Sequence, residues 1–240
     1  MKIEELKTKL GNFPIFSLET GLVLSGCERK SFIVKLSRWE KAGHITSLRR
    51  GLYGFPDKMR HVVMLDLWLA NRMYGPSYVS CERALHYHNM IPEMVFAVTS
   101  VTARKPVDMK NKETLFIYRN VKPSLIWGYT GVELEEKPFS VADQGPTFIA
   151  RPEKALLDYF WLHPGVNWCP ERLEAELRLR YSEHFSVRRF MSYAKRFHSP
   201  RMIQAAKVAL EVMQTEKESW EEVPEDLAES EMQAPTQSPC

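Results

Sequence analysis

Apolar residues recur at helical spacing through the first 42 residues of the chain, and this pattern predicts three short helices. The first covers residues 3–10. The second covers residues 18–23, and Ser25-Gly26 after it suits a tight turn between helices. The third covers residues 28–42, and Gly43 follows where a helix often ends in a left-handed residue. The first helix is expected to pack beneath the other two through Ile3, Leu6 and Leu10.

The third predicted helix has an apolar face and a basic face. On a helical wheel the apolar face consists of Phe32, Ile33, Leu36 and Trp39. The opposite face carries Lys30, Ser31, Lys35, Ser37, Arg38 and Lys41. Trp39 is therefore assigned to the core and not to stacking on a base.

Two short runs typical of strands follow at residues 45–48 and 52–55, and Arg49-Arg50-Gly51 joins them. They predict a hairpin with positive charge at its tip, in which Tyr53 is structural. Three helices and this hairpin together predict a winged helix-turn-helix over residues 1–60. A basic helix face beside a basic hairpin offers phosphate anchors and an element for the major groove of DNA. The competing interpretation is a small helical domain that makes protein contacts.

If the segment binds double-stranded DNA, the third helix is expected in a major groove. Base edges and nearby phosphates would be faced by Ser31, Val34, Lys35 and Arg38. The DNA backbone would be contacted by Lys30 and Lys41. Arg49 and Arg50 on the hairpin would reach phosphates or the adjacent minor groove, where arginine is favoured if the groove is narrow.

The remaining chain predicts a second domain at residues 61–217 and an acidic, disordered tail at residues 218–240. Strongly apolar residues predict a helix over 61–74, at the joint between the two domains. Short β-branched or aromatic runs predict a small, mostly antiparallel sheet with strands at residues 95–102, 114–120, 124–129 and 139–142. Further helices are expected at residues 82–88, 153–162, 171–181, 187–197 and 200–217. The fold class is therefore α+β, with C-terminal helices after the sheet.

The net charge of +3 hides an uneven distribution. Residues 1–61 contain 12 Lys and Arg against 6 Asp and Glu, whereas residues 215–240 contain one Lys and 8 acidic residues. The chain before its acidic end therefore carries a net charge of +10, which favours binding to polyanions.

The cysteines and the hydropathy indicate the cellular setting. Cys27, Cys81, Cys169 and Cys240 are widely spaced and form no CxxC pair, which argues against a zinc ribbon. With no signal peptide, they favour a reducing cytoplasm. The longest apolar runs reach about half of the ~20 residues that span a bilayer, so a soluble protein with no membrane contact is expected.

No motif for enzymatic chemistry stands out. The phosphate-binding, dinucleotide-binding and serine-hydrolase motifs are absent from the sequence. His86 and His88 would point about 200° apart on a helix, so they could not share a metal ion there. Neither an enzyme activity nor a metal or cofactor is expected.

A second group of basic residues occurs near the C-terminus: Arg178, Arg180, Arg188, Arg189, Lys195 and Arg196. Glu174/Arg178 and Glu176/Arg180 have the i, i+4 spacing of salt bridges on a solvent-facing helix. This group is either an ordinary solvated surface, a second phosphate contact, or a docking site for an acidic partner. The acidic tail could compete for either basic surface in a salt-sensitive way.

Three blocks of the sequence resemble the antitoxin family of AbiE-type (type IV) toxin–antitoxin systems. The first is Arg50-Gly51-Leu52-Tyr53. The second is Tyr78-Val79-Ser80 with Arg83-Ala84-Leu85-His86 and Ile91-Pro92. The third, and most distinctive, is Ile149-Ala150-Arg151-Pro152-Glu153-Lys154-Ala155-Leu156-Leu157-Asp158. Together with the sheet between them, the blocks cover residues 15–165.

The resemblance implies a transcriptional autorepressor that binds repeats upstream of its own operon, with self-association on DNA. It also implies an antitoxin of a phage-defence system that counters a nucleotidyltransferase-like toxin, with the second domain supporting antitoxicity. Two alternatives stay open: a stand-alone winged-helix transcription factor without a toxin, and an adaptor that binds proteins instead of DNA.

Overall fold

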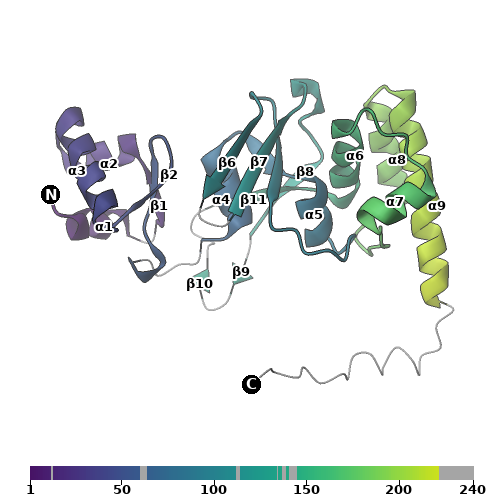
Figure 1. Ribbon diagram of the computed structural model, residues 1–240, viewed down its shortest axis with the longest axis horizontal. Helices are drawn as coiled ribbons and strands as arrows, with labels where there is room; N and C mark the ends of the chain where they lie inside the picture. The colour runs from purple at the N-terminus through teal and green to yellow at the C-terminus, as the bar shows by residue number, and fades with distance from the viewer. Residues whose placement is uncertain are drawn as a thin grey trace, which may run out of the picture. The chain divides into compact units, whose positions relative to one another are not determined.

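The computed structural model describes residues 1–11, 13–59, 64–111, 114–133, 135–136, 139–140 and 145–221, which form a mixed α+β protein (Figure 1). The chain divides into two compact units, residues 1–83 with 96–151 and residues 84–95 with 152–240. The predicted boundary between residues 60 and 61 lies outside the described residues. The disordered tail was predicted at residues 218–240, but residues 218–221 belong to the last helix, Pro200–Glu221, and the rest of the tail lies outside the described residues.

The N-terminal part of the first unit alternates short helices with short strands. Its elements are α1 (Ile3–Leu10), β1 (Ile15–Ser17), α2 (Leu18–Ser25), α3 (Arg29–Lys41), β2 (Thr46–Arg49), β3 (Leu52–Gly54) and the 3-10 turn η1 (Asp57–Met59). The strands form an antiparallel sheet in the order β1-β3-β2. The three predicted helices and the hairpin are confirmed, whereas β1 was not predicted because three residues carry no readable alternation.

One apolar cluster holds these elements together. It contains Ile3, Leu6, Leu10, Phe16, Leu18, Phe32, Leu36, Ile45 and Phe55. Ile33, which was predicted to lie on the core face of α3, is instead 45% exposed. The buried side of α3 centres on Phe32 and Leu36, and Ile33 lies beyond its edge because consecutive helical residues are about 100° apart.

A six-stranded sheet forms the rest of the first unit. Its strands are β4 (Ser77–Val79), β5 (Val98–Thr102), β6 (Val107–Asn111), β7 (Thr114–Asn120), β8 (Tyr129–Val132) and β11 (Thr147–Ala150). Their order is β6-β7-β5-β4-β11-β8. The β5–β7 and β4–β11 pairs are parallel and the other pairs are antiparallel. The prediction of a small, mostly antiparallel sheet is thus corrected to a larger, mixed one.

Two of the predicted strands differ from the structure. The run 124–129 is not a strand, because η2 (Pro123–Leu125) is a 3-10 turn and β8 begins only at Tyr129. Proline fixes φ and suits the first position of such a turn. In the run 139–142, β10 (Phe139–Ser140) pairs with β9 (Glu135–Glu136) in a separate two-stranded sheet, and residues 141–142 lie outside the described residues.

Helix α4 (Asp66–Met73) packs against β4, β5 and β11. The Tyr118 hydroxyl donates a hydrogen bond of 2.7 Å to the carbonyl oxygen of Ala70. The Asn71 side chain accepts one of 2.6 Å from the backbone N–H of Phe148. The predicted helix over 61–74 is shorter than expected, because Leu65 is extended and the helix begins at Asp66.

Helices make up the second unit, which also includes residues 84–95. They are α6 (Pro152–Leu162), α7 (Pro170–Leu177), α8 (Val187–Arg196) and α9 (Pro200–Glu221), while α5 (Cys81–Tyr87) begins in the first unit. Contacts join α6 to α8 and α9, and α9 to α7 (Figure 1). Helix α6 is central to the unit, because residues 152–160 are all buried.

The predicted helix over 171–181 ends early. Arg178 has a left-handed φ of 42° and terminates α7 at Leu177. The expected i, i+4 pairs of Arg178 and Arg180 therefore do not form. Within α7, Arg172 Nε instead lies 2.7 Å from Glu176 Oε1.

Candidate nucleic-acid interface

Helix α3 is the element that presents most of the predicted DNA-binding residues. Glu28 stands before its first turn in an extended conformation, and Gly43 follows it with a φ of +73°. Phe32 and Leu36 are buried, and the edge of the Trp39 ring meets Phe32 with centroids 6.1 Å apart. These contacts fix the rotation of the helix about its axis, so its opposite side is held toward solvent.

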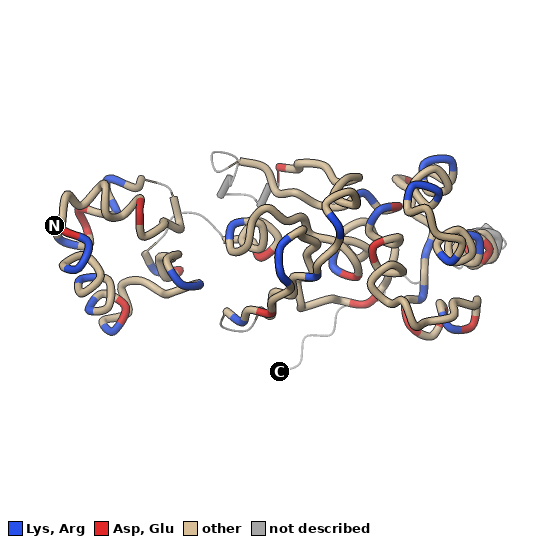
Figure 2. Tube along the Cα trace, turned by 90° about the horizontal axis from the view of Figure 1, so that it is seen from above, with Lys and Arg blue, Asp and Glu red and all other residues tan. Residues whose placement is uncertain are grey.

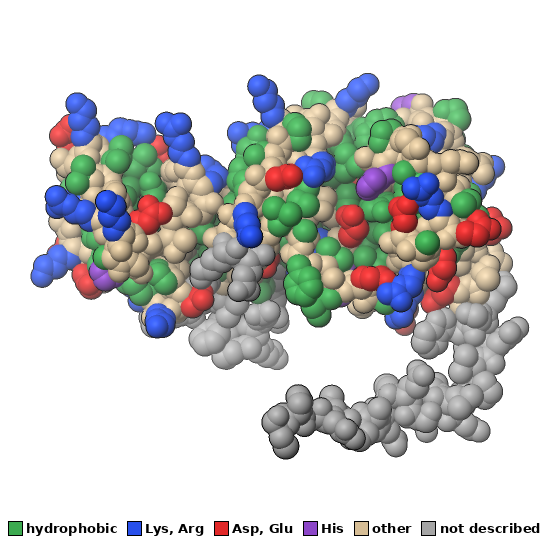
Figure 3. Space-filling view, in the orientation of Figure 1, with side chains coloured by type: hydrophobic (Ala, Val, Ile, Leu, Met, Phe, Trp, Pro, Cys, Tyr) green, Lys and Arg blue, Asp and Glu red, His purple; other side chains and the backbone are tan. Residues whose placement is uncertain are grey.

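That opposite side is basic, as the sequence predicted. Its exposed residues are Lys30, Ser31, Val34, Ser37, Arg38 and Lys41. Lys and Arg positions recur along α3 in the tube view (Figure 2), and their side chains project from the N-terminal helices in the space-filling view (Figure 3). Positions three or four apart are neighbours on a helix surface, so these cations share one face.

Lys35 lies apart from this group. Its ammonium donates a hydrogen bond of 3.2 Å to the sulfur of Cys27, and its side chain is half-buried. That hydrogen bond lowers the pKa of Cys27 below the usual value of a thiol. The same bond raises the pKa of Lys35. Lys35 thus joins the end of the α2–α3 turn to α3, a contact that the sequence did not indicate.

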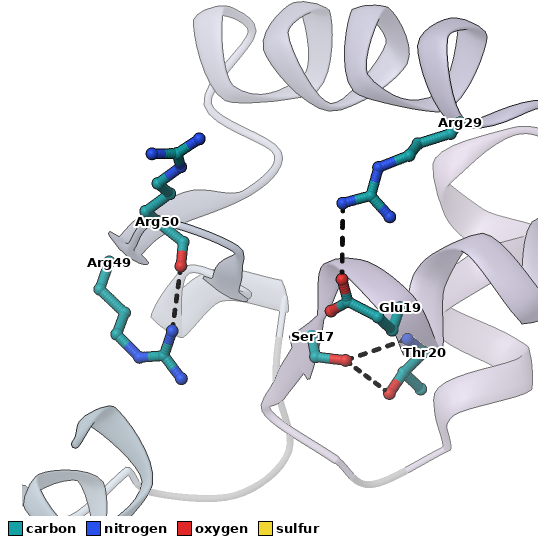
Figure 4. Close-up of polar contacts among 6 residues, drawn as sticks. All are labelled: Ser17, Glu19, Thr20, Arg29, Arg49 and Arg50. Carbon is teal, nitrogen blue, oxygen red and sulfur yellow. Dashed lines mark hydrogen bonds and ion pairs between the residues drawn. The ribbon is translucent and has the colours of Figure 1, made fainter. Parts of the chain in front are cut away.

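The hairpin between β2 and β3 carries the other two predicted residues. Gly51 turns the chain with a φ of +79°, and Arg49 and Arg50 beside it are exposed. Arg49 NH1 donates a hydrogen bond of 3.0 Å to the carbonyl oxygen of Arg50. In Figure 4 the Arg49 side chain folds toward that carbonyl, whereas the Arg50 guanidinium extends away from the other labelled residues. Arg50 is the more extended of the two cations.

Tyr53 has the structural position that was predicted for it. Its ring stacks on Phe16 of β1 with centroids 5.7 Å apart, and partial burial raises the pKa of its hydroxyl. The hairpin is therefore anchored to the core of the N-terminal part through an aromatic contact.

Polar contacts at the start of α2 complete this scaffold. The Ser17 hydroxyl oxygen accepts a hydrogen bond of 3.0 Å from the backbone N–H of Thr20, which caps the helix (Figure 4). Arg29 NH2, in the first turn of α3, lies 3.7 Å from Glu19 Oε1. Arg29 is a cation of α3 that the sequence reasoning did not assign, and its pairing with Glu19 positions α3 against α2.

The second predicted basic group does not form a single free surface. Arg178 is paired with Glu93, and Arg189 NH1 lies 3.0 Å from Oε1 of the buried Glu153. The Arg189 side chain therefore forms an ion pair with a carboxylate in the interior of the second unit. The exposed members of the group are Arg178, Arg180, Arg188, Lys195 and Arg196. Of these, Arg188, Lys195 and Arg196 share α8.

Comparison with known proteins does not assign a family. No protein-family model matches the chain, and no curated protein matches it either. Among the described residues, no three His, Cys, Asp or Glu side chains are grouped to hold a metal ion. No helix in the described ranges is long and apolar enough to cross a membrane.

Proposed function

We propose that residues 1–59 form a winged helix-turn-helix that binds double-stranded DNA, with α3 in the major groove. The observations that support this proposal are the exposed basic side of α3 and the exposed arginine hairpin, both of which belong to the part of the chain built on one small apolar core. A helix that turns one side to solvent, with cations on that side, meets the geometric need of major-groove binding. The hairpin supplies cations for the flanking phosphates.

The residues divide into two roles under this proposal. Lys30 and Lys41 contact the DNA backbone, while Ser31, Val34 and Arg38 face base edges. Arg49 and Arg50 reach phosphates or the adjacent minor groove. Lys35 contributes less to DNA binding than its sequence position suggested, because its ammonium donates a hydrogen bond to the Cys27 sulfur.

The test is a titration of the full chain against the DNA upstream of its own gene, followed by fluorescence anisotropy at several salt concentrations. Removing two phosphate contacts in Lys30→Ala/Lys41→Ala should weaken binding and reduce the salt slope by about two. Lys110→Ala/Lys122→Ala removes the same charge from exposed positions on β6 and just before η2, and should leave the slope unchanged. Equal losses in both variants would reduce the interface to a general charge effect. Weak, equal binding to an unrelated duplex would contradict sequence-specific recognition.

We propose further that the protein is a cytoplasmic autorepressor and the antitoxin of a nucleotidyltransferase-like toxin. This step rests on the resemblance of its three sequence blocks to AbiE-type antitoxins. The second and third blocks contribute β4 and β11, which pair in parallel at Val79 and Ile149. None of Cys27, Cys81 and Cys169 forms a disulfide, which fits a reducing compartment.

Co-expression with the neighbouring gene tests this second step. If that gene encodes a nucleotidyltransferase that arrests growth, the wild-type chain should restore growth. Arg188→Glu/Lys195→Glu should bind DNA normally yet restore growth less well if α8 faces the toxin. A neighbouring gene of another kind, with upstream DNA binding intact, would instead make the protein a stand-alone transcription factor.

A further inference from the structure

An apolar side chain lies at the centre of the basic side of α3. Val34 is 49% exposed, and it does not belong to the apolar cluster that holds the N-terminal part together. Lys30 and Arg38, four residues before and after it, flank it on the same face. The core is complete without Val34, since Phe32 and Leu36 fill the buried side of the helix.

Among the described residues, the apolar core of the N-terminal part gives no reason for a valine at this place, because Val34 is not one of its members. A β-branched residue lowers helix propensity, because its side chain loses rotational freedom against the preceding turn. Val34 stands in the interior of a 13-residue helix, so this disadvantage applies to it fully. About half of its surface stays exposed, so its burial within the N-terminal part is incomplete.

The edges of the bases offer one apolar group in the major groove, the C5-methyl group of thymine. The other groups by which the base pairs differ strongly there are hydrogen-bond donors and acceptors. A valine pressed against those would bury them without a partner, which is unfavourable. Against a thymine methyl, both apolar surfaces leave water together.

We propose that Val34 is a specificity-determining residue that selects thymine by contact with its methyl group. The inference rests on the DNA-binding function proposed above and specifies what that site recognises. Lys30 and Lys41 supply affinity that depends little on sequence, and Val34 supplies discrimination at the position facing the middle of α3.

The experiment begins with selection of preferred duplexes from a random pool by the full chain. Each thymine of the selected site is then replaced singly by deoxyuridine, which pairs identically but lacks the methyl group. At one or two positions the dissociation constant should rise about fourfold, the effect of one buried methyl group. In Val34→Ala the same replacements should change affinity little, because the contact is already lost.

Ile33→Ala is the matched control. Ile33 is also β-branched and 45% exposed on α3, but it points about 100° away from Val34. This variant should keep the full deoxyuridine effect. The inference is overturned if no thymine shows the effect, or if the effect persists undiminished in Val34→Ala. If the pool yields no preferred sequence, the proposed sequence-specific binding of DNA is itself overturned. If a preferred site emerges but no deoxyuridine replacement changes its dissociation constant, only the inference about Val34 is overturned.

Discussion

The ion pair between Lys154 and Asp158 gives the sharpest prediction about stability. Both side chains are fully buried in α6, where they are paired four residues apart. The Lys154 ammonium also lies 5.4 Å from the centre of the Phe197 ring. Replacing Asp158 with leucine leaves a buried ammonium without its carboxylate. Loss of one member of a buried pair lowers the free energy of unfolding by about 3–5 kcal/mol.

The double replacement should be far milder than either single one. Lys154→Met/Asp158→Leu removes both charges together and keeps the volume apolar, which is often nearly neutral for a buried pair. The exposed pair Arg172–Glu176 has the same spacing on α7, with side chains 48% and 32% exposed. Arg172→Ala should lower stability by only about 0.3–0.5 kcal/mol.

Urea unfolding followed by tryptophan fluorescence measures these differences. Trp168 packs against Phe160 of α6 with ring centroids 5.1 Å apart, so its emission reports on the surroundings of the pair. The reasoning is refuted if Asp158→Leu loses no more stability than Arg172→Ala. It is equally refuted if Lys154→Met/Asp158→Leu loses as much free energy of unfolding as the single variants Lys154→Met and Asp158→Leu lose when their losses are added.

Three other perturbations have defined outcomes. Gly21→Ala should destabilise by about 1–3 kcal/mol in urea unfolding, because its Cβ would lie 2.7 Å from Phe32 Cζ; an unchanged midpoint would mean that the ring moves freely. Lys35→Met should shift the pH profile of Cys27 alkylation by iodoacetamide upward, because the lysine lowers the pKa of that thiol; superimposable profiles would contradict this. Burial raises the pKa of Tyr118, so the folded state holds that proton longer and stability should fall as pH rises above about 10. In Tyr118→Phe this pH dependence should be absent. The free energy of unfolding at neutral pH should fall by about 1–3 kcal/mol, because the Ala70 carbonyl loses its hydrogen-bond donor. Urea unfolding followed by circular dichroism at several pH values measures both effects.

Local periodicity predicted much of the N-terminal part. The helices at residues 3–10 and 28–42, the glycine that ends α3, and the arginine hairpin all follow from spacing and turn chemistry. The helices predicted at residues 153–162 and 187–197 match α6 and α8 for the same reason. Patterns over one or two helical turns decide these features, so the sequence alone contains them.

Tertiary contacts decided what those patterns could not. Strand β1 exists because Ile15–Ser17 finds β3 as a partner, and β11 lies in parallel beside β4 across about 70 residues of chain. Ile33 is exposed because the core centres on Phe32 and Leu36, and the Lys35 ammonium donates a hydrogen bond to the Cys27 sulfur. Arg178 pairs with Glu93 and not with Glu174, its expected partner on the helix. Arg189 pairs with the buried carboxylate of Glu153. The sequence by itself determined where charged residues, apolar residues and turn-forming glycines stand along the chain. The folded chain determined which of these cations are held in contacts, because two carboxylates and a thiol from other elements bind them, and no local pattern records those pairings.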